Sequence, residues 1–234
     1  MISFDAREYW DFENPSASRS RFEALLGKYP TSIELEIKAQ IARTYSLERE
    51  FESANVILDN LQSDPNLENH PRAHGCYLLE RGRCLRDTGN IEKAQAHFKL
   101  ATTLGDPEIR IDALHMLALL EEPEKAVIMN QSALAECLAS NVPSARRWAG
   151  SLYNNLGWGL FELGRTQEAL QSFQSALKER VESGSRIDSA RWCVARCLRA
   201  MGEHNEALEI LMLMDQSDPN VIEEIELNRK NTKL

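Results

Sequence analysis

The stretch GRCLRDTGNIEKAQAHFKLA, residues 82–101, decides the fold, because its pattern returns further along the chain. Residues 157–176, GWGLFELGRTQEALQSFQSA, repeat its two glycines, two alanines and phenylalanine at identical spacing. In the first copy these positions are Gly82, Gly89, Ala94, Phe98 and Ala101. Internal repeats with a period of about 30–45 residues are typical of stacked supersecondary units, not of one globular fold.

Two weaker copies carry larger side chains in some of these positions. They read Ala42, Arg49, Ala54, Leu58, Leu61 and Ala195, Gly202, Ala207, Leu211, Met214. A degenerate unit from Pro107 to about position 142 lacks both glycines and has Asn130 where the others have phenylalanine or leucine. The chain therefore contains about five repeated units.

Helix signals divide each unit into two helices. The first copy predicts one helix over about 71–88 and a second over about 91–104, separated by Gly89. Gly105-Asp106-Pro107 then ends the second helix and starts the next, because glycine is favoured just after a helix and proline at its first position. The small residue in each first helix allows close approach of the second. Phe98 and Phe173 fill the space between hairpins.

Both ends of the repeat array carry segments that predict caps. Asn14-Pro15 starts a helix containing Phe22 that echoes a second helix without its partner. We expect residues 1–13, with Tyr9, Trp10 and Phe12, to cover the exposed apolar end. Asp218-Pro219 opens a last helix, in which we expect Val221, Ile222 and Ile225 to form one apolar face.

The repeat pattern resembles the tetratricopeptide repeat, a helix-turn-helix unit of about 34 residues. The resemblance covers roughly residues 31–220 and includes the family's Leu-Gly pair at Leu156-Gly157. It implies an all-α fold, a right-handed superhelical solenoid of about five hairpins with capping helices. The predicted organisation is a single domain over 1–234. Its parts are a cap and half-repeat (1–30), the repeats (31–219) and a C-terminal capping helix and tail (220–234).

Composition and charge restrict the partners and the location. The net charge is −9 and the sequence pI about 5.2, which disfavours nucleic acid and anionic membranes as partners. Neither a signal peptide nor an apolar membrane span is visible, so a cytoplasmic location is expected. The five cysteines form no C-x-x-C pair. This fits buried thiols in a reducing compartment better than a redox or metal site.

A row of arginines is predicted on the concave wall, where the resemblance implies that the family's ligands lie. The chain has 19 Arg against 8 Lys. The position after each small first-helix residue reads Arg43, Arg83, His115, Trp158 and Arg196, and the position three further on reads Ser46, Arg86, Ala118, Phe161 and Arg199. Such a row would attract an acidic segment. The alternative is that the arginines pair with carboxylates of neighbouring helices, among them Glu80 and Asp112.

The C-terminal half of this wall is aromatic. Trp158 and Trp192 are expected to project from neighbouring first helices, with Phe161 one turn from Trp158. Tryptophan and arginine are enriched at interface hot spots. Asn154 and Asn155 lie one turn before Trp158, and the resemblance implies that such asparagines hold a ligand main chain. The alternative is that both tryptophans fill the core between helices.

These features predict a protein-interaction module or adaptor that binds a peptide, acidic or mixed in charge, in its concave groove. One alternative is a structural solenoid that self-associates as a homo-oligomer. Another is a regulator or enzyme that binds a small ligand in a Trp158–Trp192 pocket. Catalytic motifs and cofactor-binding motifs are missing from the sequence, so no enzyme activity and no cofactor or metal are expected. The family's clamp for chaperone tails is not supported, because Glu36 and Gln40 occupy its matching positions.

Overall fold

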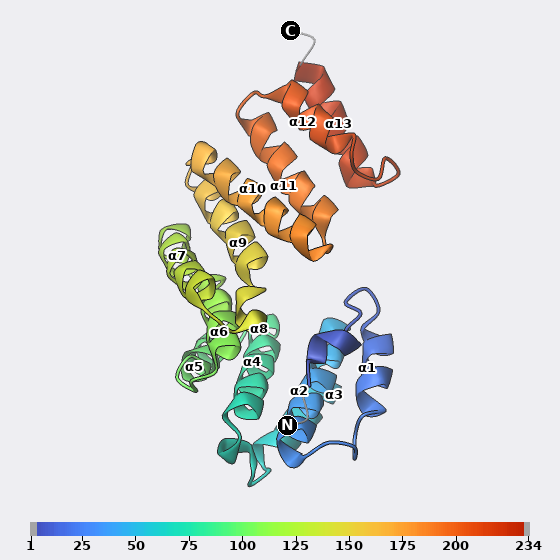
Figure 1. Ribbon diagram of the computed structural model, residues 1–234, viewed down its shortest axis with the longest axis vertical. Coiled ribbons are helices and arrows are strands. Elements are labelled where there is room, and N and C mark those ends of the chain that lie inside the picture. The colour runs from blue at the N-terminus through green and yellow to red at the C-terminus, as the bar shows by residue number, and fades with distance from the viewer. Residues whose placement is uncertain (1–3, 232–234) are drawn as a thin grey trace. The chain divides into compact units, whose positions relative to one another are not determined.

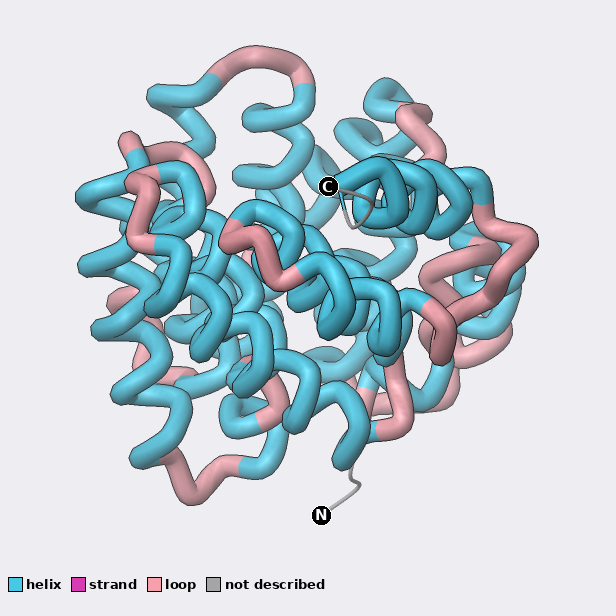
Figure 2. Tube along the Cα trace, turned by 90° about the horizontal axis from the view of Figure 1, so that it is seen from above, coloured by secondary structure: helices cyan, strands magenta, loops and turns pink. Residues whose placement is uncertain are grey.

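The computed structural model of the protein describes residues 4–231, and every regular element in this range is helical (Figure 2). The backbone contacts separate two compact units, residues 1–120 and 121–234, called unit 1 and unit 2 below. The N-terminal cap and the C-terminal tail predicted from the sequence extend into residues 1–3 and 232–234, which lie outside the described residues. Within residues 4–231, no helix combines the length and the hydrophobicity that crossing a membrane requires.

Unit 1 is a stack of helical hairpins (Figure 1). Helices α2 and α3 form one hairpin and α4 and α5 the next, while α1 packs on α2, and α6 packs on both α4 and α5. The elements are the 3-10 helices η1 (Ala6–Tyr9) and η2 (Leu67–Asn69) and the α-helices α1 (Pro15–Glu23), α2 (Thr31–Leu47), α3 (Phe51–Gln62), α4 (Pro71–Asp87), α5 (Ile91–Ala101) and α6 (Pro107–Ala118).

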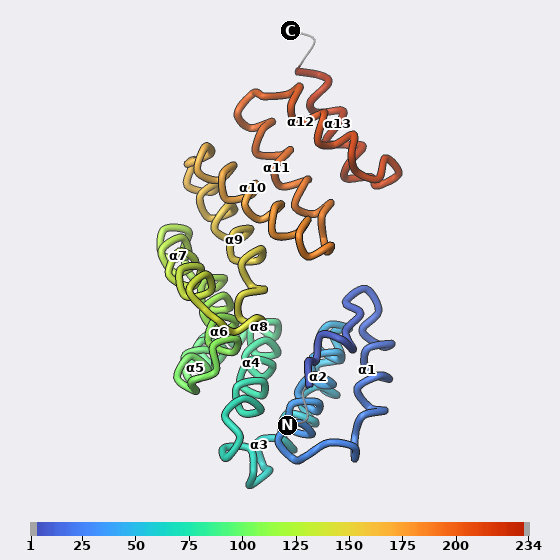
Figure 3. The backbone as a smooth tube through the Cα atoms, in the orientation of Figure 1, coloured from blue at the N-terminus to red at the C-terminus, as the bar shows by residue number. Residues whose placement is uncertain are grey.

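Unit 2 is built on the same plan (Figure 3). Helices α9 and α10 form one hairpin and α11 and α12 another, while α7 packs on α9, and α13 closes the stack on α11 and α12. Its helices are α7 (Pro123–Ala139), α8 (Pro143–Arg146), α9 (Ala149–Glu162), α10 (Thr166–Ser183), α11 (Ile187–Ala200), α12 (His204–Leu211) and α13 (Pro219–Asn231). The prediction of an all-α fold of stacked hairpins is confirmed. The grouping of all repeats into a single domain stays a prediction.

The repeated glycines and phenylalanines are partners inside each hairpin, whereas the sequence pattern predicts that the phenylalanines lie between hairpins. A Cβ atom added to Gly82 would lie 2.4 Å from Cε1 of Phe98, and one added to Gly157 would lie 2.6 Å from Cδ1 of Phe173. Both rings are buried. In two other repeats of the chain the corresponding pair is alanine with leucine, and all four of these side chains are buried. They are Ala42 with Leu58 and Ala195 with Leu211. A small first-helix residue therefore goes with a large second-helix residue.

The first helix of each regular hairpin ends in the same backbone turn. Two residues after α4, α9 and α11, the positions Gly89, Gly164 and Gly202 have φ of 84°, 72° and 85°. In α4 the next amide, of Asn90, donates to the carbonyl oxygen of Leu85, which is the 6→1 bond of a Schellman motif. The same bonds recur after α2, where the left-handed residue is Arg49 with φ of 63°.

Replacing Arg49 by glycine is expected to stabilise unit 1 by about 0.5–1 kcal/mol. A non-glycine residue in the left-handed region costs about 1–2 kcal/mol, and the greater freedom of glycine in the unfolded chain offsets part of this gain. Urea denaturation followed by circular dichroism measures the change. The reverse substitution, Gly89→Arg, is the matched control and should destabilise. An unchanged or less stable Arg49→Gly protein would contradict the prediction.

One helix limit in this repeat differs from the sequence prediction. Helix α4 ends at Asp87, close to the expected 88, but α5 ends at Ala101 rather than near 104. The backbone amides of Thr103 and Leu104 donate to the carbonyl oxygens of Leu100 and Ala101, three residues back instead of four, so the helix ends in a tighter turn. The next helix begins as predicted, with Asp106 capping the amide of Ile109 at 3.0 Å.

The N-terminal segment covers the apolar end of unit 1, as the sequence predicts. Tyr9 and Trp10 pack against the buried ring of Phe22, with ring centroids 5.9 and 5.4 Å away. Phe12 is different, because its side chain is 46% exposed and stacks on the outer face of Trp10 at 4.7 Å. The Asn14 side chain caps α1 by accepting from the amide of Ala17.

The C-terminal helix buries a different face from the one predicted. Val221 and Ile225 are buried, but Ile222 is 44% exposed. Helical geometry places residues four positions apart on one face and adjacent residues about 100° apart. The buried face of α13 is therefore completed by Glu224 and Asn228, two polar residues, rather than by Ile222.

Candidate functional site

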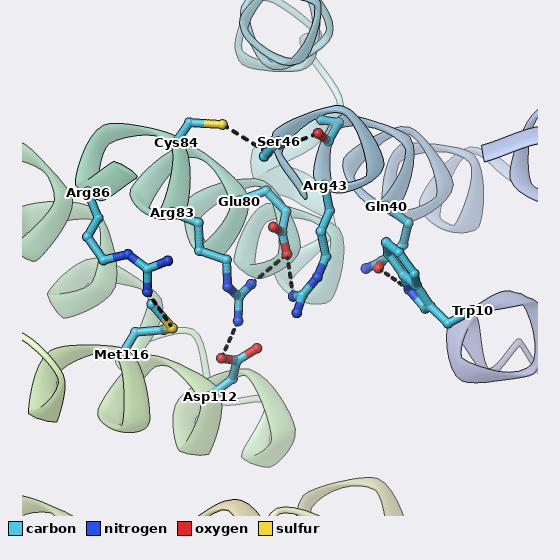
Figure 4. A network of polar contacts seen from close by, with 11 residues as sticks. Trp10, Gln40, Arg43, Ser46, Glu80, Arg83, Cys84, Arg86, Asp112 and Met116 are labelled. Atoms are coloured by element: carbon cyan, nitrogen blue, oxygen red, sulfur yellow. Dashed lines mark hydrogen bonds and ion pairs between the residues drawn. The ribbon is translucent and has the colours of Figure 1, made fainter. Parts of the chain in front are cut away.

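The predicted arginine row of unit 1 is part of a buried ionic network across three first helices (Figure 4). Arg43 of α2 and Arg83 of α4 both donate to Oε1 of Glu80, at 3.1 and 2.6 Å. Arg83 also donates to Oδ1 of Asp112 on α6, at 2.5 Å. Two arginines thus face two carboxylates, and the four charges sum to zero.

Burial and neighbouring charge act on these arginines in opposite ways. Burial opposes the charge of Arg83, but the carboxylates of Asp112 and Glu80 outweigh it and hold its pKa above the usual range. Burial lowers the pKa of Arg43, and the positive charge of Arg83 beside it lowers it further. Arg43 also lies over the ring of Trp10, 5.6 Å from its centroid, and Trp10 in turn donates to Gln40. The N-terminal segment therefore covers this part of the wall.

A second cluster ties the beginnings of the same three helices together. Arg72 of α4 donates to Glu36 of α2 at 3.2 Å, and to Asp106 and Glu108 at the start of α6, at 3.0 and 2.9 Å. Burial raises the pKa of Glu36, which Arg72 partly counteracts. The sequence prediction missed Arg72. Its three partners lie 34 to 36 positions away in the chain and do not share its register relative to the small first-helix residues.

Arg86 and His115, the other predicted wall residues of unit 1, also face this network. Arg86 of α4 pairs with Asp87 at 2.6 Å and reaches the sulfur of Met116 at 3.9 Å. His115 of α6 is half-buried. Burial lowers the pKa of His115 to about 4, and nearby Arg83, Arg86 and Arg43 act in the same direction. Of the two interpretations of the arginine row, the structure shows the ion-paired one for Arg43, Arg83 and Arg86.

Unit 1 is expected to lose stability on acidification because of His115. Its pKa is about 4 in the folded protein, against 6.5 for the free side chain. Between these values the unfolded state binds more protons, so the free energy of unfolding falls as the pH falls from 6.5 to 4. The His115→Gln variant should show a shallower decline in Tm over this range. Parallel profiles of the two proteins would contradict the assignment.

In unit 2, the predicted aromatic wall residues come together with one arginine. The indole rings of Trp158 on α9 and Trp192 on α11 lie 6.3 Å apart. The guanidinium of Arg196 lies over both rings, 4.6 Å from the centroid of Trp192 and 5.4 Å from that of Trp158. Phe161 meets Trp158 edge to face at 5.7 Å. These four half-buried side chains are called the tryptophan–arginine cluster.

The base of this cluster is fixed by core packing. Trp158 contacts the buried ring of Phe173 on α10, with centroids 5.1 Å apart. Asn154 and Asn155 are half-buried on α9. The thiol of Cys193 on α11 donates to Oδ1 of Asn154 at 3.4 Å. Burial raises the pKa of Cys193 to about 11, so this thiol is protonated at neutral pH and is not a nucleophile.

Arg199, the last residue of the predicted row, is engaged by the C-terminal helix. Its guanidinium forms an ion pair with the buried carboxylate of Glu224 on α13. Asn228 continues this contact, because its side-chain amide donates to the carbonyl oxygen of Glu224 and its own Oδ1 lies 3.1 Å from Nδ1 of His204. The polar residues on the buried face of α13 therefore have partners on α11 and α12.

The junction between α9 and α11 differs from the other junctions between neighbouring first helices within unit 1 and within unit 2. Arginine–carboxylate pairs bridge α2 to α4, α4 to α6 and α11 to α13. At α9–α11 the tryptophan–arginine cluster takes their place, and none of the residues from 4 to 231 forms an ion pair with Arg196. Arg196 is thus a wall arginine whose charge the described part of the chain leaves uncompensated.

The described residues provide no group of three histidine, cysteine or acidic side chains arranged to hold a metal ion. His70 and His74, at the start of α4, are therefore not part of such a group. All five cysteines are buried and free.

Comparison with known proteins supports the repeat assignment. Residues 150–180, which form most of the α9–α10 hairpin, match the model of the tetratricopeptide repeat family. No curated protein matches the chain by sequence.

Solved structures share the fold at low sequence identity. A signal transduction ATPase with numerous domains and a tetratricopeptide repeat sensor, from Pyrococcus horikoshii, is 15% identical with a TM-score of 0.68, over 94% of this chain and 36% of that one. The APC/C hetero-tetramer Cut9–Hcn1 is 14% identical with a TM-score of 0.67, over 92% of this chain and 40% of that one. BtubC from P. vanneervenii is 16% identical with a TM-score of 0.62, over 93% and 95%.

The chain spans 36% and 40% of the length of the first two of these structures, so the likeness concerns their fold alone. Residues 150–180 therefore carry a tetratricopeptide repeat by sequence, and the helical hairpins of the chain share the fold of solved structures, one of which has a tetratricopeptide repeat sensor.

Proposed function

We propose that the protein is an interaction module in which unit 2 holds a peptide segment of a partner against the tryptophan–arginine cluster. The tetratricopeptide repeat fold supports an interaction scaffold in general, and the similar Cut9–Hcn1 structure is itself a hetero-tetramer. The observation that carries the position of the site is the uncompensated charge of Arg196 at the α9–α11 junction. An acidic segment of the partner would supply the missing carboxylate.

The residues beside Arg196 suit this role. Trp158 and Trp192 offer large, half-buried aromatic surfaces, and such residues together with arginine dominate interface energetics. Their rigid rings lose little conformational entropy on binding. Asn154 and Asn155 precede Trp158 on the same helix, and the side-chain NH2 of Asn154 can donate to a partner's main chain while its Oδ1 accepts the Cys193 thiol.

The proposed contact surface is smaller than the sequence prediction. It comprises Asn154, Asn155, Trp158, Phe161, Trp192 and Arg196. Arg43, Arg83 and Arg86 in unit 1 and Arg199 in unit 2 already have carboxylate partners, so recruiting them would require breaking an existing ion pair. Breaking a buried pair is costly.

Selection from a random peptide library displayed on phage tests this proposal. Peptides enriched on the wild-type protein should bind the Arg196→Gln variant at least about tenfold more weakly, as for a hot-spot residue. Arg191→Gln is the matched control, because Arg191 lies on the same helix but pairs with Asp188 at 2.9 Å. It should bind like wild type. Failure to enrich any peptide, or enriched peptides that are indifferent to Arg196→Gln, would refute the site.

A further inference from the structure

The indole N–H of Trp192 is a buried donor without an acceptor. Its Nε1 atom is shielded from solvent and has no hydrogen-bond partner among the described residues. Trp10 shows the usual arrangement in the same chain, because its Nε1 donates to Oε1 of Gln40 at 2.9 Å. Leaving a buried donor unpaired costs free energy, so an unpaired N–H inside a candidate site indicates a missing acceptor.

Arg196 supplies further donors at the same place. Its guanidinium lies over the Trp192 ring, and none of its N–H groups has a partner within residues 4–231. Nearby, Asn154 uses Oδ1 to accept the thiol of Cys193. The unpaired groups of the tryptophan–arginine cluster are therefore donors. A ligand that complements them is an acceptor on more than one atom.

Charge distinguishes between the two common anionic groups of proteins. The cluster presents one uncompensated positive charge, on Arg196, in a chain with a net charge of −9. A carboxylate brings one negative charge and two acceptor oxygens, and so balances Arg196. A phosphorylated side chain brings up to two negative charges and would leave one of them unbalanced.

We propose that the tryptophan–arginine cluster recognises a single carboxylate of the partner, an Asp or Glu side chain, next to a large apolar side chain. This rests on the proposed function and names what it recognises. On binding, Arg196 pairs with the carboxylate, and the side chains around the indole rearrange so that its N–H donates to the second oxygen. The exposed faces of Trp158 and Phe161 receive the apolar neighbour.

Hydrocinnamate is a probe that carries both elements, one carboxylate and one phenyl ring. NMR spectra of the isotope-labelled protein report the tryptophan indole N–H signals, and the Trp192→Phe spectrum assigns that of Trp192. Hydrocinnamate should shift the Trp192 signal with saturation, while the neutral isostere hydrocinnamide should not. Phenethylphosphonate, measured in mildly alkaline buffer where it carries two charges, should bind more weakly than hydrocinnamate.

Variants separate the two donors. Arg196→Gln should weaken hydrocinnamate about tenfold, as expected for loss of the charged partner. Trp192→Phe keeps an aromatic ring but removes the N–H, and should weaken it roughly two- to tenfold, the range of a single hydrogen bond. Arg191→Gln should leave the affinity unchanged.

The result that overturns the inference is equal binding of the carboxylate and the amide, tighter binding of the phosphonate, or binding that survives Arg196→Gln. Phage selection separates this from failure of the proposed function. If enriched peptides depend on Arg196 but hydrocinnamate fails, the peptide site stands and carboxylate recognition falls. If the peptides also ignore Arg196, both proposals fall.

Discussion

Replacing Arg83 by methionine is expected to lower the free energy of unfolding of unit 1 by about 3–5 kcal/mol. Arg83 is 8% exposed and pairs with both Glu80 and Asp112, which are buried as well. Methionine fills a similar volume but leaves the charge of Asp112 without its partner. Loss of one member of a buried pair costs more than the pair itself contributes, because the remaining charge stays desolvated. Urea denaturation measures the change.

Two further variants make this result specific. Arg83→Met combined with Asp112→Leu should be more stable than Arg83→Met alone, since both members of the pair are then apolar. Arg165→Met removes an exposed pair with Glu168 and should leave the unfolding curve unchanged. A double variant as unstable as the single one would show that lost packing, and not the isolated charge, explains the effect.

The buried ion pairs of Arg83 also make it an unsuitable residue for testing partner binding. Arg83→Glu would place three carboxylates together in a buried position, so a loss of partner binding in that variant would report unfolding. Arg196 is the better probe, because it is half-buried and no ion pair with the described residues depends on it.

Replacing Gly157 by alanine is expected to destabilise unit 2 by about 1–3 kcal/mol. The added Cβ would lie 2.6 Å from Cδ1 and Cε1 of Phe173, closer than carbon atoms can approach. The ring is buried at 1% exposure and also packs against Trp158, so it cannot move aside freely. Urea denaturation measures the loss, and circular dichroism checks that the helices remain.

Phe173→Leu should rescue Gly157→Ala. Two other repeats already combine a buried alanine in the first helix with a buried leucine in the second. These pairs are Ala42 with Leu58 and Ala195 with Leu211. The double variant should therefore be more stable than the sum of the two single changes predicts, with a coupling energy of about 0.5–3 kcal/mol. Strict additivity would show that the glycine and the phenylalanine do not constrain each other.

The predicted local structure followed from residue types whose effect is short-range. Glycine in left-handed turns and proline at helix starts gave helix limits within a few residues, as at Pro71 and Pro107. At α5 the chain leaves the helix after Ala101, because the amides of Thr103 and Leu104 bond three residues back instead of four. The position of Gly105 does not specify where such a tighter turn begins.

The candidate site was predicted less completely. Trp158, Trp192 and Arg196 were placed on one wall from their register, and the structure brings them together across α9 and α11. Register did not indicate which arginines have carboxylate partners. That depends on which carboxylate the neighbouring helix supplies. Asp112 on α6 pairs with Arg83, and Glu224 on α13 pairs with Arg199.

The sequence by itself determined the all-α fold and the stacking of hairpins, because these depend on periodicity and on the pairing of small with large residues at fixed spacing. Only the tertiary structure decided which wall arginine keeps an uncompensated charge. An ion pair forms between residues far apart in the chain, here 29 positions for Arg83 with Asp112 and 25 for Arg199 with Glu224. Its formation depends on distances of a few ångströms that helix packing sets.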